Sequence, residues 1–303
     1  MNDHVARAVE MLRAGGVVAV PTETVYGLAA DVENARAIKR VYAIKGRPTD
    51  HPLIVHAHDL EALDGYVAEI TPALRVLAVR FWPGPLTAVV ARGARTPRTV
   101  TGGQDTVAVR VPDHPLTRAI LAAFGGAVAA PSANRFGRVS PTTAEHVRAE
   151  LGDEVDLIVD GGPARVGVES TIVDLTGAVP AVLRAGAITP SQLGAALGSP
   201  VVTRVGGDVR APGTLRSHYA PRARVVLVAG EDRDAQARRG TQAGERVAVL
   251  ALPDDPAAAA RELYATLRAL DADGYDTIVA SLPLDTEANA AVRDRLTRAA
   301  ASQ

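Results

Sequence analysis

The stretch "AIKGRPTDHPLIVH", residues 43–56, holds the end of one expected helix and the start of an expected strand. Val41 and Lys45 are four residues apart and so share one face of that helix. Gly46 is a favourable helix C-cap, and Pro48 prevents the helix from continuing. The run "PLIVHA" that follows has the apolar, β-branched composition of a buried strand. A helix followed directly by a buried strand is typical of an α/β fold.

The same alternation extends over about the first 200 residues and predicts an α/β fold built on one large twisted mixed sheet with helices. Helices are expected around residues 34–45, 58–67, 71–81, 114–124, 142–151 and 190–197. Strands are expected at residues 16–25, 52–57, 86–92, 106–111, 126–133, 156–161, 170–175 and 181–186.

The composition changes near residue 200. Residues 201–222 are rich in glycine, proline and arginine and show little periodicity, which predicts a linker. Residues 223–303 then follow a strand-strand-helix-strand-helix pattern, which predicts a small Rossmann-like α/β domain. We therefore expect a larger domain over residues 1–200, an interdomain linker over 201–222 and a small domain over 223–303.

Composition excludes several classes of chemistry. The 303 residues carry a net charge of −1, so a broad basic face for stable nucleic-acid binding is not expected, although a local basic pocket is compatible with this charge. The chain has no cysteine, which rules out disulfides, thiolate nucleophiles and cysteine-bound metals. It has no signal-peptide pattern and no apolar run near the roughly 18 residues of a membrane span. A cytoplasmic protein without membrane contact is expected.

Lysine is rare in this chain. Lys39 and Lys45 are the only two lysines among 33 basic residues. A cation at a helix end complements the helix dipole, but arginine would serve equally well, and the scarcity itself matches a GC-rich genome. Lys45 beside Arg47 offers a compact point charge next to a planar fork, a pair that suits a polyphosphate. We favour a functional Lys45 and expect arginine there to change stability by less than about 0.5 kcal/mol.

A second unusual stretch is "APSANRFGRVSP", residues 130–141. The chain has only eight serines, and Ser132 and Ser140 lie in this one stretch. Ser132 and Asn134 follow an expected strand, and the ends of strands in α/β sheets commonly bind ligands. Serine, asparagine and glycine also form ordinary turns, so a ligand site and a simple connection both fit.

Several familiar motifs do not occur. "GGPARVGVESTIVDL", residues 161–175, is rich in glycine but lacks the G-x-G-x-x-G pattern, and the chain has neither a P-loop nor a kinase signature. It also lacks the G-x-S-x-G motif of many serine hydrolases. His56 and His58 fall on one face of an expected strand, but no further ligands have suitable spacing. No metal site is predicted.

Taken together, "PTETVYGL" (21–28), "KGRP" (45–48), "HPLIVH" (51–56), "PSAN" (131–134) and "GVESTIVD" (167–174) resemble the YrdC-like L-threonylcarbamoyladenylate (threonylcarbamoyl-AMP) synthase family. The hallmark of that family is a Lys-x-Arg paired with a Ser-x-Asn, here Lys45/Arg47 and Ser132/Asn134. The motifs occur in family order over residues 1–200, which implies a YrdC-like catalytic domain. The linker "APGTLRSHYAP" and the small domain after it resemble the long, two-domain form.

The resemblance implies an enzyme, a nucleotidyltransferase. L-threonine, bicarbonate and ATP, with Mg²⁺, would give threonylcarbamoyl-AMP and pyrophosphate. A separate threonylcarbamoyl transferase would then modify tRNA to N6-threonylcarbamoyladenosine. One alternative is a double-stranded RNA-binding module without ATP turnover. Another is a carbamoyl-transfer domain of metalloenzyme maturation, but such proteins carry additional segments for which this chain has no room.

The resemblance also implies roles for individual residues. Lys45 and Arg47 would be catalytic. L-threonine would contact Thr24, His56, Arg110 and Ser170. ATP would contact Arg47, His51, Thr106, Ser132, Asn134, Ser140, Arg184 and the linker residues His218 and Tyr219. The chain departs from the family at His51, where asparagine is common, and at Ala211 and Thr214, where the linker usually begins Ser-Pro-Gly-Met.

Overall fold

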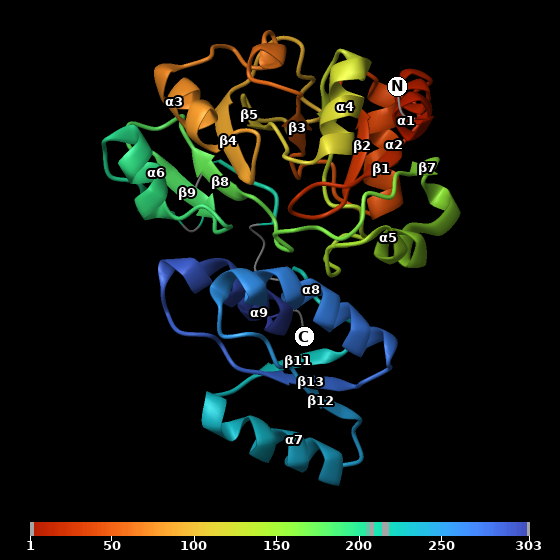
Figure 1. Ribbon diagram of the computed structural model, residues 1–303, viewed down its shortest axis with the longest axis vertical. Coiled ribbons are helices and arrows are strands. Elements are labelled where there is room, and N and C mark those ends of the chain that lie inside the picture. The colour runs from red at the N-terminus through yellow and green to blue at the C-terminus, as the bar shows by residue number, and fades with distance from the viewer. Residues whose placement is uncertain (1–2, 205, 207–208, 214–217, 302–303) are drawn as a thin grey trace.

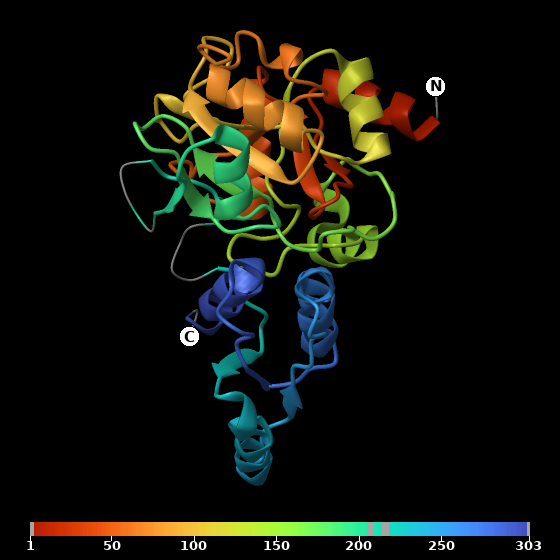
Figure 2. The same cartoon turned by 60° about the vertical axis from the view of Figure 1, so that its left-hand side comes forward.

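The protein is described by a computed structural model that covers residues 3–204, 206, 209–213 and 218–301. Within these ranges the strands form two sheets, a mixed sheet of ten strands and a parallel sheet of three (Figure 1). The two units are stacked along the long axis of the molecule, and helices α8 (Pro256–Ala272) and α9 (Ala290–Ala300) of the smaller unit face the larger one (Figures 1 and 2).

The large sheet has the strand order β10-β9-β8-β4-β5-β3-β6-β2-β1-β7. The neighbours β3 and β5, β4 and β8, β1 and β7, and β9 and β10 are parallel, and the remaining pairs are antiparallel. The predicted mixed sheet is thus confirmed. Its strands are β1 Val18–Val20, β2 Gly27–Asp31, β3 Ile54–His56, β4 Leu86–Ala91, β5 Thr106–Arg110, β6 Val128–Ala129, β7 Leu157–Ile158, β8 Thr171–Asp174, β9 Ala181–Arg184 and β10 Val202–Thr203.

Local sequence explains where the helices begin and end. In α2 (Ala35–Lys45) the Asn34 side chain caps the first turn by accepting bonds from the backbone of Arg36 and Ala37. The helix ends at Gly46, which adopts a left-handed φ of 60°, as the sequence predicts. The other helices of the large unit are α1 Asp3–Arg13, α3 Pro72–Phe81, α4 Pro115–Phe124, α5 Ala144–Leu151 and α6 Pro190–Leu197.

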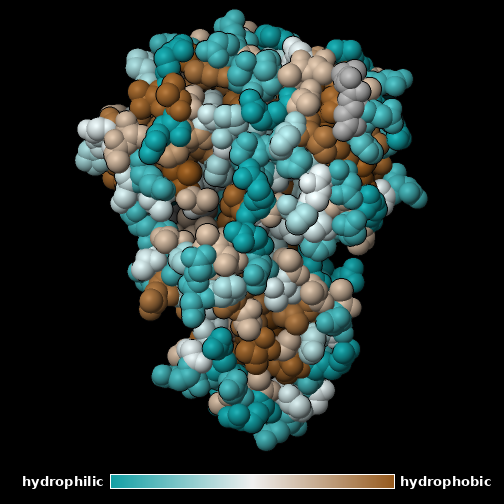
Figure 3. All heavy atoms as spheres, in the orientation of Figure 1, coloured by the Kyte–Doolittle hydropathy of each residue, from teal (hydrophilic) through white to brown (hydrophobic). Residues whose placement is uncertain are grey.

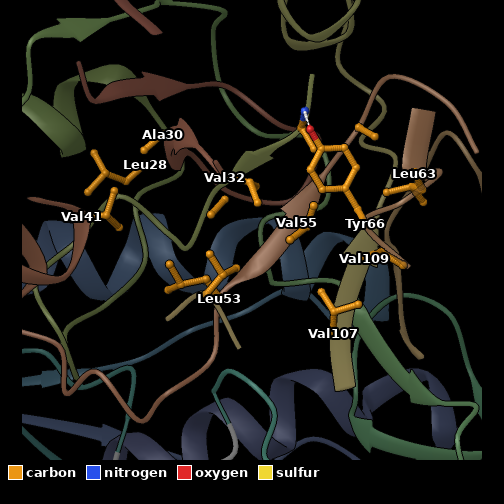
Figure 4. Close-up of a cluster of buried hydrophobic side chains, with 14 of the residues drawn as sticks. Leu28, Ala30, Val32, Val41, Leu53, Val55, Leu63, Tyr66, Val107 and Val109 are labelled. Atoms are coloured by element: carbon orange, nitrogen blue, oxygen red, sulfur yellow. Dashed lines mark hydrogen bonds between the residues drawn. The ribbon is translucent and has the colours of Figure 1, made fainter. Parts of the chain in front are cut away.

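Alternation of side chains along the strands gives the large sheet two different faces. Val55, Val107 and Val109 point into the main core (Figure 4). Helices α2, α3 and α5 also contribute buried residues to this core. On the same strands, Ile54 and Ala108 point to the opposite face, where they pack with Ala211 of the linker. The linker therefore lies on the sheet face that carries Ile54 and Ala108. The candidate site is on this same face.

The small unit differs from its prediction. Its sheet has the order β11-β13-β12, and all three strands are parallel. The expected strand-strand start is wrong, because helix α7 (Arg233–Gln242) lies between β11 (Arg224–Leu227) and β12 (Val247–Val249), with β13 (Thr277–Ala280) in the centre. Parallel strands need a long crossover connection, which α7 supplies. Its sequence "RDAQARRGTQ" buries no residue, so it has no apolar face that periodicity could reveal.

Two further expectations for the large unit are corrected. The helix expected over residues 58–67 is only a 3₁₀ turn, Glu61–Leu63. The strand expected over residues 16–25 is limited to β1, and β2 follows it as a separate strand. The sequence of β2, "GLAAD", has no β-branched residue, so only its pairing with β1 and β6 makes it a strand. Strand β10 falls within the segment expected to be a linker.

The surface is mostly polar. Figure 3 shows hydrophilic residues over much of the face seen in Figure 1, with apolar residues in separate patches. Across the described ranges, no helix has the length and apolar character needed to cross a membrane.

Candidate active site

A pocket lies where the linker passes over the central strands. It brings together residues that are far apart in the sequence, from the loop before β2, from β3 and β5, from the loop after β6 and from the linker. Nine of the predicted site residues line it: Thr24, Arg47, His56, Arg110, Ser132, Ser170, Arg184, His218 and Tyr219. Glu169, Pro212 and Gly213 also line the pocket, and sequence reasoning did not select them.

The parallel pairing of β3 with β5 sets His56 directly beside Arg110. His56 Nδ1 lies 3.0 Å from the Ile54 carbonyl oxygen. A carbonyl only accepts, so Nδ1 carries the proton and Nε2 is left as an acceptor. Burial, and then the charge of Arg110, lower the pKa of His56 to about 3. The imidazole is therefore neutral near pH 7 and can accept a hydrogen bond at Nε2.

Arg110 is held on three sides. It donates from Nε to the Gly84 carbonyl (3.2 Å), from Nη1 to Thr24 Oγ1 (2.9 Å) and from Nη2 to Glu23 Oε1 (2.6 Å). The other Glu23 oxygen accepts from the backbone of Asp113 at 2.9 Å. These bonds use three of the five guanidinium hydrogens, and one hydrogen remains on each terminal nitrogen for a bidentate ligand. The buried Glu23, missed by the sequence analysis, follows Thr22 in the quoted "PTETVYGL".

Arg184 connects the sheet to the linker. Its Nε and Nη2 donate to the carbonyl and the hydroxyl oxygen of Ser170, both at 3.0 Å. Its Nη1 donates to the Pro212 carbonyl of the linker at 2.9 Å. Ser170 Oγ is also 2.7 Å from Thr87 Oγ1. Arg184 therefore fixes one wall of the pocket and holds the segment that covers it.

The structure joins the two halves of the hallmark motif. Lys45 Nζ donates to the backbone carbonyls of Ser132 at 2.5 Å and Asn134 at 2.6 Å. Lys45 is only 2% exposed, and burial, followed by the charge of Arg47, holds its pKa well below its ordinary value. Its ammonium group lies behind the pocket wall rather than on it, and it supports the loop that carries Ser132.

Arg47 lies at one end of a row of aromatic rings. It donates to the Pro52 carbonyl at 2.9 Å, and burial lowers its pKa to about 10, so it stays charged at neutral pH. Its guanidinium carbon is 5.5 Å from the centre of the Phe136 ring. Edge-to-face contacts then link Phe136 to His51 at 5.3 Å and to the linker residue His218 at 5.6 Å.

Two buried polar atoms near the pocket have no hydrogen-bond partner within the described parts of the chain, Asn134 Oδ1 and His218 Nδ1. Such atoms are rare in folded proteins and call for a ligand, an ion or water. Asn134 is otherwise fixed, because its amide nitrogen donates to the carbonyls of Arg135 and Arg138. Burial lowers the pKa of His218 to about 3, so its ring is neutral.

Five predicted residues do not line the pocket: Lys45, His51, Thr106, Asn134 and Ser140. Thr106 is half-buried at the start of β5, four residues from Arg110 and on the same face of the strand. Ser140 is buried and its hydroxyl lies 2.5 Å from Glu169 Oε1. Thr214 lies outside the described residues. No group of three or more metal-ligating His, Cys, Asp or Glu side chains occurs within the ranges that the structure covers.

Two family descriptions match the chain. The Sua5/YciO/YrdC family, described as "Telomere recombination", matches residues 10–186. The description "Threonylcarbamoyl-AMP synthase, C-terminal domain" matches residues 188–301. The chain belongs to the Sua5/YciO/YrdC family.

Similar proteins of this family cover the chain almost from end to end. A threonylcarbamoyl-AMP synthase from Pyrococcus abyssi is 39% identical over 96% of this chain and 92% of its own length. A Bacillus subtilis protein of the same name is 39% identical over 99% and 94%. The crystal structure of P. abyssi Sua5 complexed with L-threonine superimposes with a TM-score of 0.94 over 98% of this chain and 94% of that one, at 36% identity. The YrdC-like fold and the family expected from the sequence are thus confirmed.

Proposed function

We propose that this chain is an L-threonylcarbamoyladenylate synthase, which makes threonylcarbamoyl-AMP and pyrophosphate from L-threonine, bicarbonate and ATP. The observation that carries this proposal is the pairing of two kinds of site in one pocket. Arg110 keeps two hydrogens for a carboxylate beside a neutral His56, while Arg47 and Arg184 supply positive charge for phosphates. An amino acid and a nucleotide can therefore be held next to each other.

The reaction requires the protein to orient the substrates, and it requires no nucleophilic side chain, because the attacking oxygen belongs to the substrate. The threonine amine forms a bond to the carbon of CO₂ with loss of a proton, or to that of bicarbonate with loss of water. An oxygen of the resulting N-carboxylate then attacks the α-phosphorus, and the bond to the departing pyrophosphate breaks. Arg110 would hold the amino-acid carboxylate, and His56 Nε2 would accept a hydrogen bond from the amine. Negative charge grows on the phosphate oxygens, where Arg47 and Arg184 would stabilise it.

Mg²⁺ fits this site as a companion of ATP. Asn134 Oδ1 is a buried oxygen without a partner among the described residues, and oxygen is the donor that Mg²⁺ prefers. Mg²⁺ is commonly held by few protein groups and by substrate phosphates, which agrees with the lack of an acidic cluster in the described ranges. We propose Asn134 as its protein ligand. Bound there, the ion would neutralise phosphate charge.

We further propose the organisation in which this activity operates. Residues 1–200 would form the catalytic domain, 201–222 the linker and 223–303 the small Rossmann-like domain. The product would pass to a separate transferase that acts on tRNA in the cytoplasm. A double-stranded RNA-binding role is not favoured, because curated relatives over nearly the full chain are named as synthases.

The test is a direct assay. Purified protein with ATP, L-threonine, bicarbonate and Mg²⁺ should give the adenylate by mass spectrometry and release pyrophosphate. Omitting either threonine or bicarbonate should stop pyrophosphate release. Equal turnover without one of them, or tight salt-sensitive RNA binding with no turnover, would reject the assignment.

A further inference from the structure

A buried carboxylate lies between the pocket and the small unit. Glu169 lines the pocket wall and is 6% exposed. Its Oε1 accepts a bond from Ser140 Oγ at 2.5 Å. Its Oε2 accepts from Tyr264 OH of α8 at 2.8 Å and from Arg295 Nε of α9 at 2.9 Å. Two of its three partners thus belong to the small C-terminal unit.

The ionisation state of Glu169 determines which group donates in each hydrogen bond of this cluster. Burial alone would raise the pKa of its carboxyl, but Arg295 and Arg184 outweigh burial and bring it to about 2. An ionised carboxylate can only accept, so Ser140, Tyr264 and Arg295 all donate to it. A full negative charge therefore sits at the wall of a pocket that has to receive a polyphosphate.

Arg295 offsets that charge from the other unit. Its side chain is fully buried, and its Nη1 also lies 2.7 Å from Asp294 Oδ2. Its guanidinium carbon is 4.9 Å from the centre of the Tyr219 ring, so it also packs on the linker. Tyr219 has a left-handed φ of 62°, unusual for a bulky residue, which indicates that its surroundings hold it in place.

We propose that Arg295 of the small unit is a positioning residue of the nucleotide site, which neutralises Glu169 and holds Tyr219 over the pocket. This inference rests on the proposed function, in which the pocket binds ATP. Without Arg295, Glu169 would keep its hydrogen bonds from Ser140 and Tyr264 but lose its ion pair, so its negative charge would face the phosphates with less compensation. Like charges at short range in a buried site repel strongly, since solvent screens them poorly.

A second contact from the small unit supports the same arrangement. Arg268 of α8 donates from Nε to the Ser140 carbonyl at 3.3 Å and from Nη2 to the Val139 carbonyl. Arg268 also forms an ion pair with Glu150 of α5. Ser140 is therefore held by its backbone through Arg268 and by its hydroxyl through Glu169. The small unit therefore contacts the Ser140 backbone directly and its hydroxyl only through Glu169.

The test measures ATP binding by calorimetry and steady-state kinetics in the full-length protein. Arg295→Met should raise the Kd and the KM for ATP at least about tenfold, with a smaller effect on the KM for threonine. The double variant with Arg295→Met and Glu169→Gln should regain part of the ATP affinity, since the second change removes the uncompensated charge. A purely structural role of Arg295 predicts no such rescue, because the second change removes a further contact.

Tyr264→Phe is a milder variant that should still fold, because it deletes one hydrogen bond to Glu169 and keeps the shape of the ring. It should weaken ATP binding a few-fold with little change in Tm. Arg293→Met on the same helix, which removes an ion pair with Asp285 and a bond to the Pro283 carbonyl but no contact with Glu169, is the matched control and should leave ATP affinity unchanged. An unchanged ATP affinity in Arg295→Met, or a double variant as weak as the single one, would overturn the proposal.

The parent protein separates this inference from the function on which it rests. If the parent binds ATP but makes no adenylate, the proposed reaction fails, while the binding comparison among the variants still decides the role of Arg295. If the parent makes the adenylate and Arg295→Met binds ATP as the parent does, the proposed reaction stands and the role of Arg295 is wrong.

Discussion

At the scale of single residues, Lys45 shows how burial changes an interpretation. The sequence places it on the apolar face of a helix end, and the structure buries it between two carbonyl groups of the Ser132–Asn134 loop. A guanidinium is larger and planar and cannot occupy this space without shifting the loop. The sequence-based expectation that Lys45→Arg changes stability by less than about 0.5 kcal/mol is therefore replaced.

Lys45→Arg should now lower the free energy of unfolding by about 1–3 kcal/mol, the usual cost of overpacking a buried site. Turnover should fall at least about tenfold, which corresponds to roughly 1.4 kcal/mol of transition-state stabilisation. Urea unfolding and pyrophosphate release measure the two effects. Lys39→Arg, on the exposed side of the same helix, is the control. A fully active and stable Lys45→Arg would mean that the charge alone is required.

Lys45 also predicts a proton linked to ATP binding. Burial holds the pKa of the free protein's Lys45 well below its ordinary value, and phosphate nearby would raise it again. At a pH between the Lys45 pKa of the free protein and that of the ATP complex, Lys45 must therefore take up a proton when ATP binds. In this range ATP affinity must fall as pH rises. Calorimetry in buffers of different ionisation enthalpy measures this uptake. Lys45→Arg should abolish it, and an uptake that persists in the variant would assign the proton to another group.

Arg110→Lys should raise the KM for threonine at least about tenfold, and should raise the KM for ATP less. A lysine ammonium cannot reproduce the fork that contacts Thr24 and Glu23 while keeping two hydrogens free. Initial rates at varied threonine and varied ATP separate the two constants. An impaired ATP constant with normal threonine binding would instead place Arg110 at the nucleotide.

At the scale of elements, one glycine lets a loop approach a helix. Gly167 has a φ of 81°, and a Cβ at this position would lie 2.4 Å from the Arg261 Cα of α8. The loop that carries Glu169 and Ser170 can therefore pack on the backbone of α8 only if residue 167 lacks a side chain.

Gly167→Ala should destabilise the protein by more than about 2 kcal/mol, since the strain of a left-handed alanine adds to the clash. Gly162→Ala is the matched control, because φ there is 78° but a Cβ would meet no described atom within 4 Å. It should cost only about 1 kcal/mol. Denaturant unfolding compares them, and equal losses would show that the clash with α8 relaxes freely.

At the scale of the whole molecule, the two units share a core. Val25, Val139 and Val168 of the large unit pack with Leu263 and Tyr264 of α8. The ion pair of Arg138 with Asp271, at 3.3 Å, bridges the same interface. The small unit thus covers apolar surface of the large one besides its contacts with Glu169.

A chain truncated after Arg204 should retain the large sheet but lose stability and ATP affinity. Exposing the three valines, at about 1.5 kcal/mol each, should cost about 4.5 kcal/mol and lower Tm by roughly 9–18 °C. ATP should then bind more weakly, because the linker cover and Arg295 are both absent. Thermal unfolding with and without ATP measures both effects. Residues 223–303 alone should make no adenylate, and adenylate formation by them would contradict the proposed division of the chain.

The sequence by itself determined the mixed α/β class, most strands and helices of the large unit, and the family. Those features depend on local patterns, such as the helix that ends at Gly46 and the β-branched run before His56. Motifs in a fixed order also located nine residues that line the pocket. Helix α7, which buries no residue, and strand β2, which has no β-branched residue, carried no such local signal, so they were missed.

Tertiary structure alone decided which of these residues meet, and at what charge. The pairing of β3 with β5 places His56 beside Arg110, and no local pattern encodes which strands become neighbours. Burial keeps His56 neutral, whereas the charges of Arg295 and Arg184 keep Glu169 ionised against burial, so both pKa values depend on groups brought from distant parts of the chain. The contact between Glu169 and Arg295 joins residues 126 positions apart, so it arises only when the small unit packs against the large one.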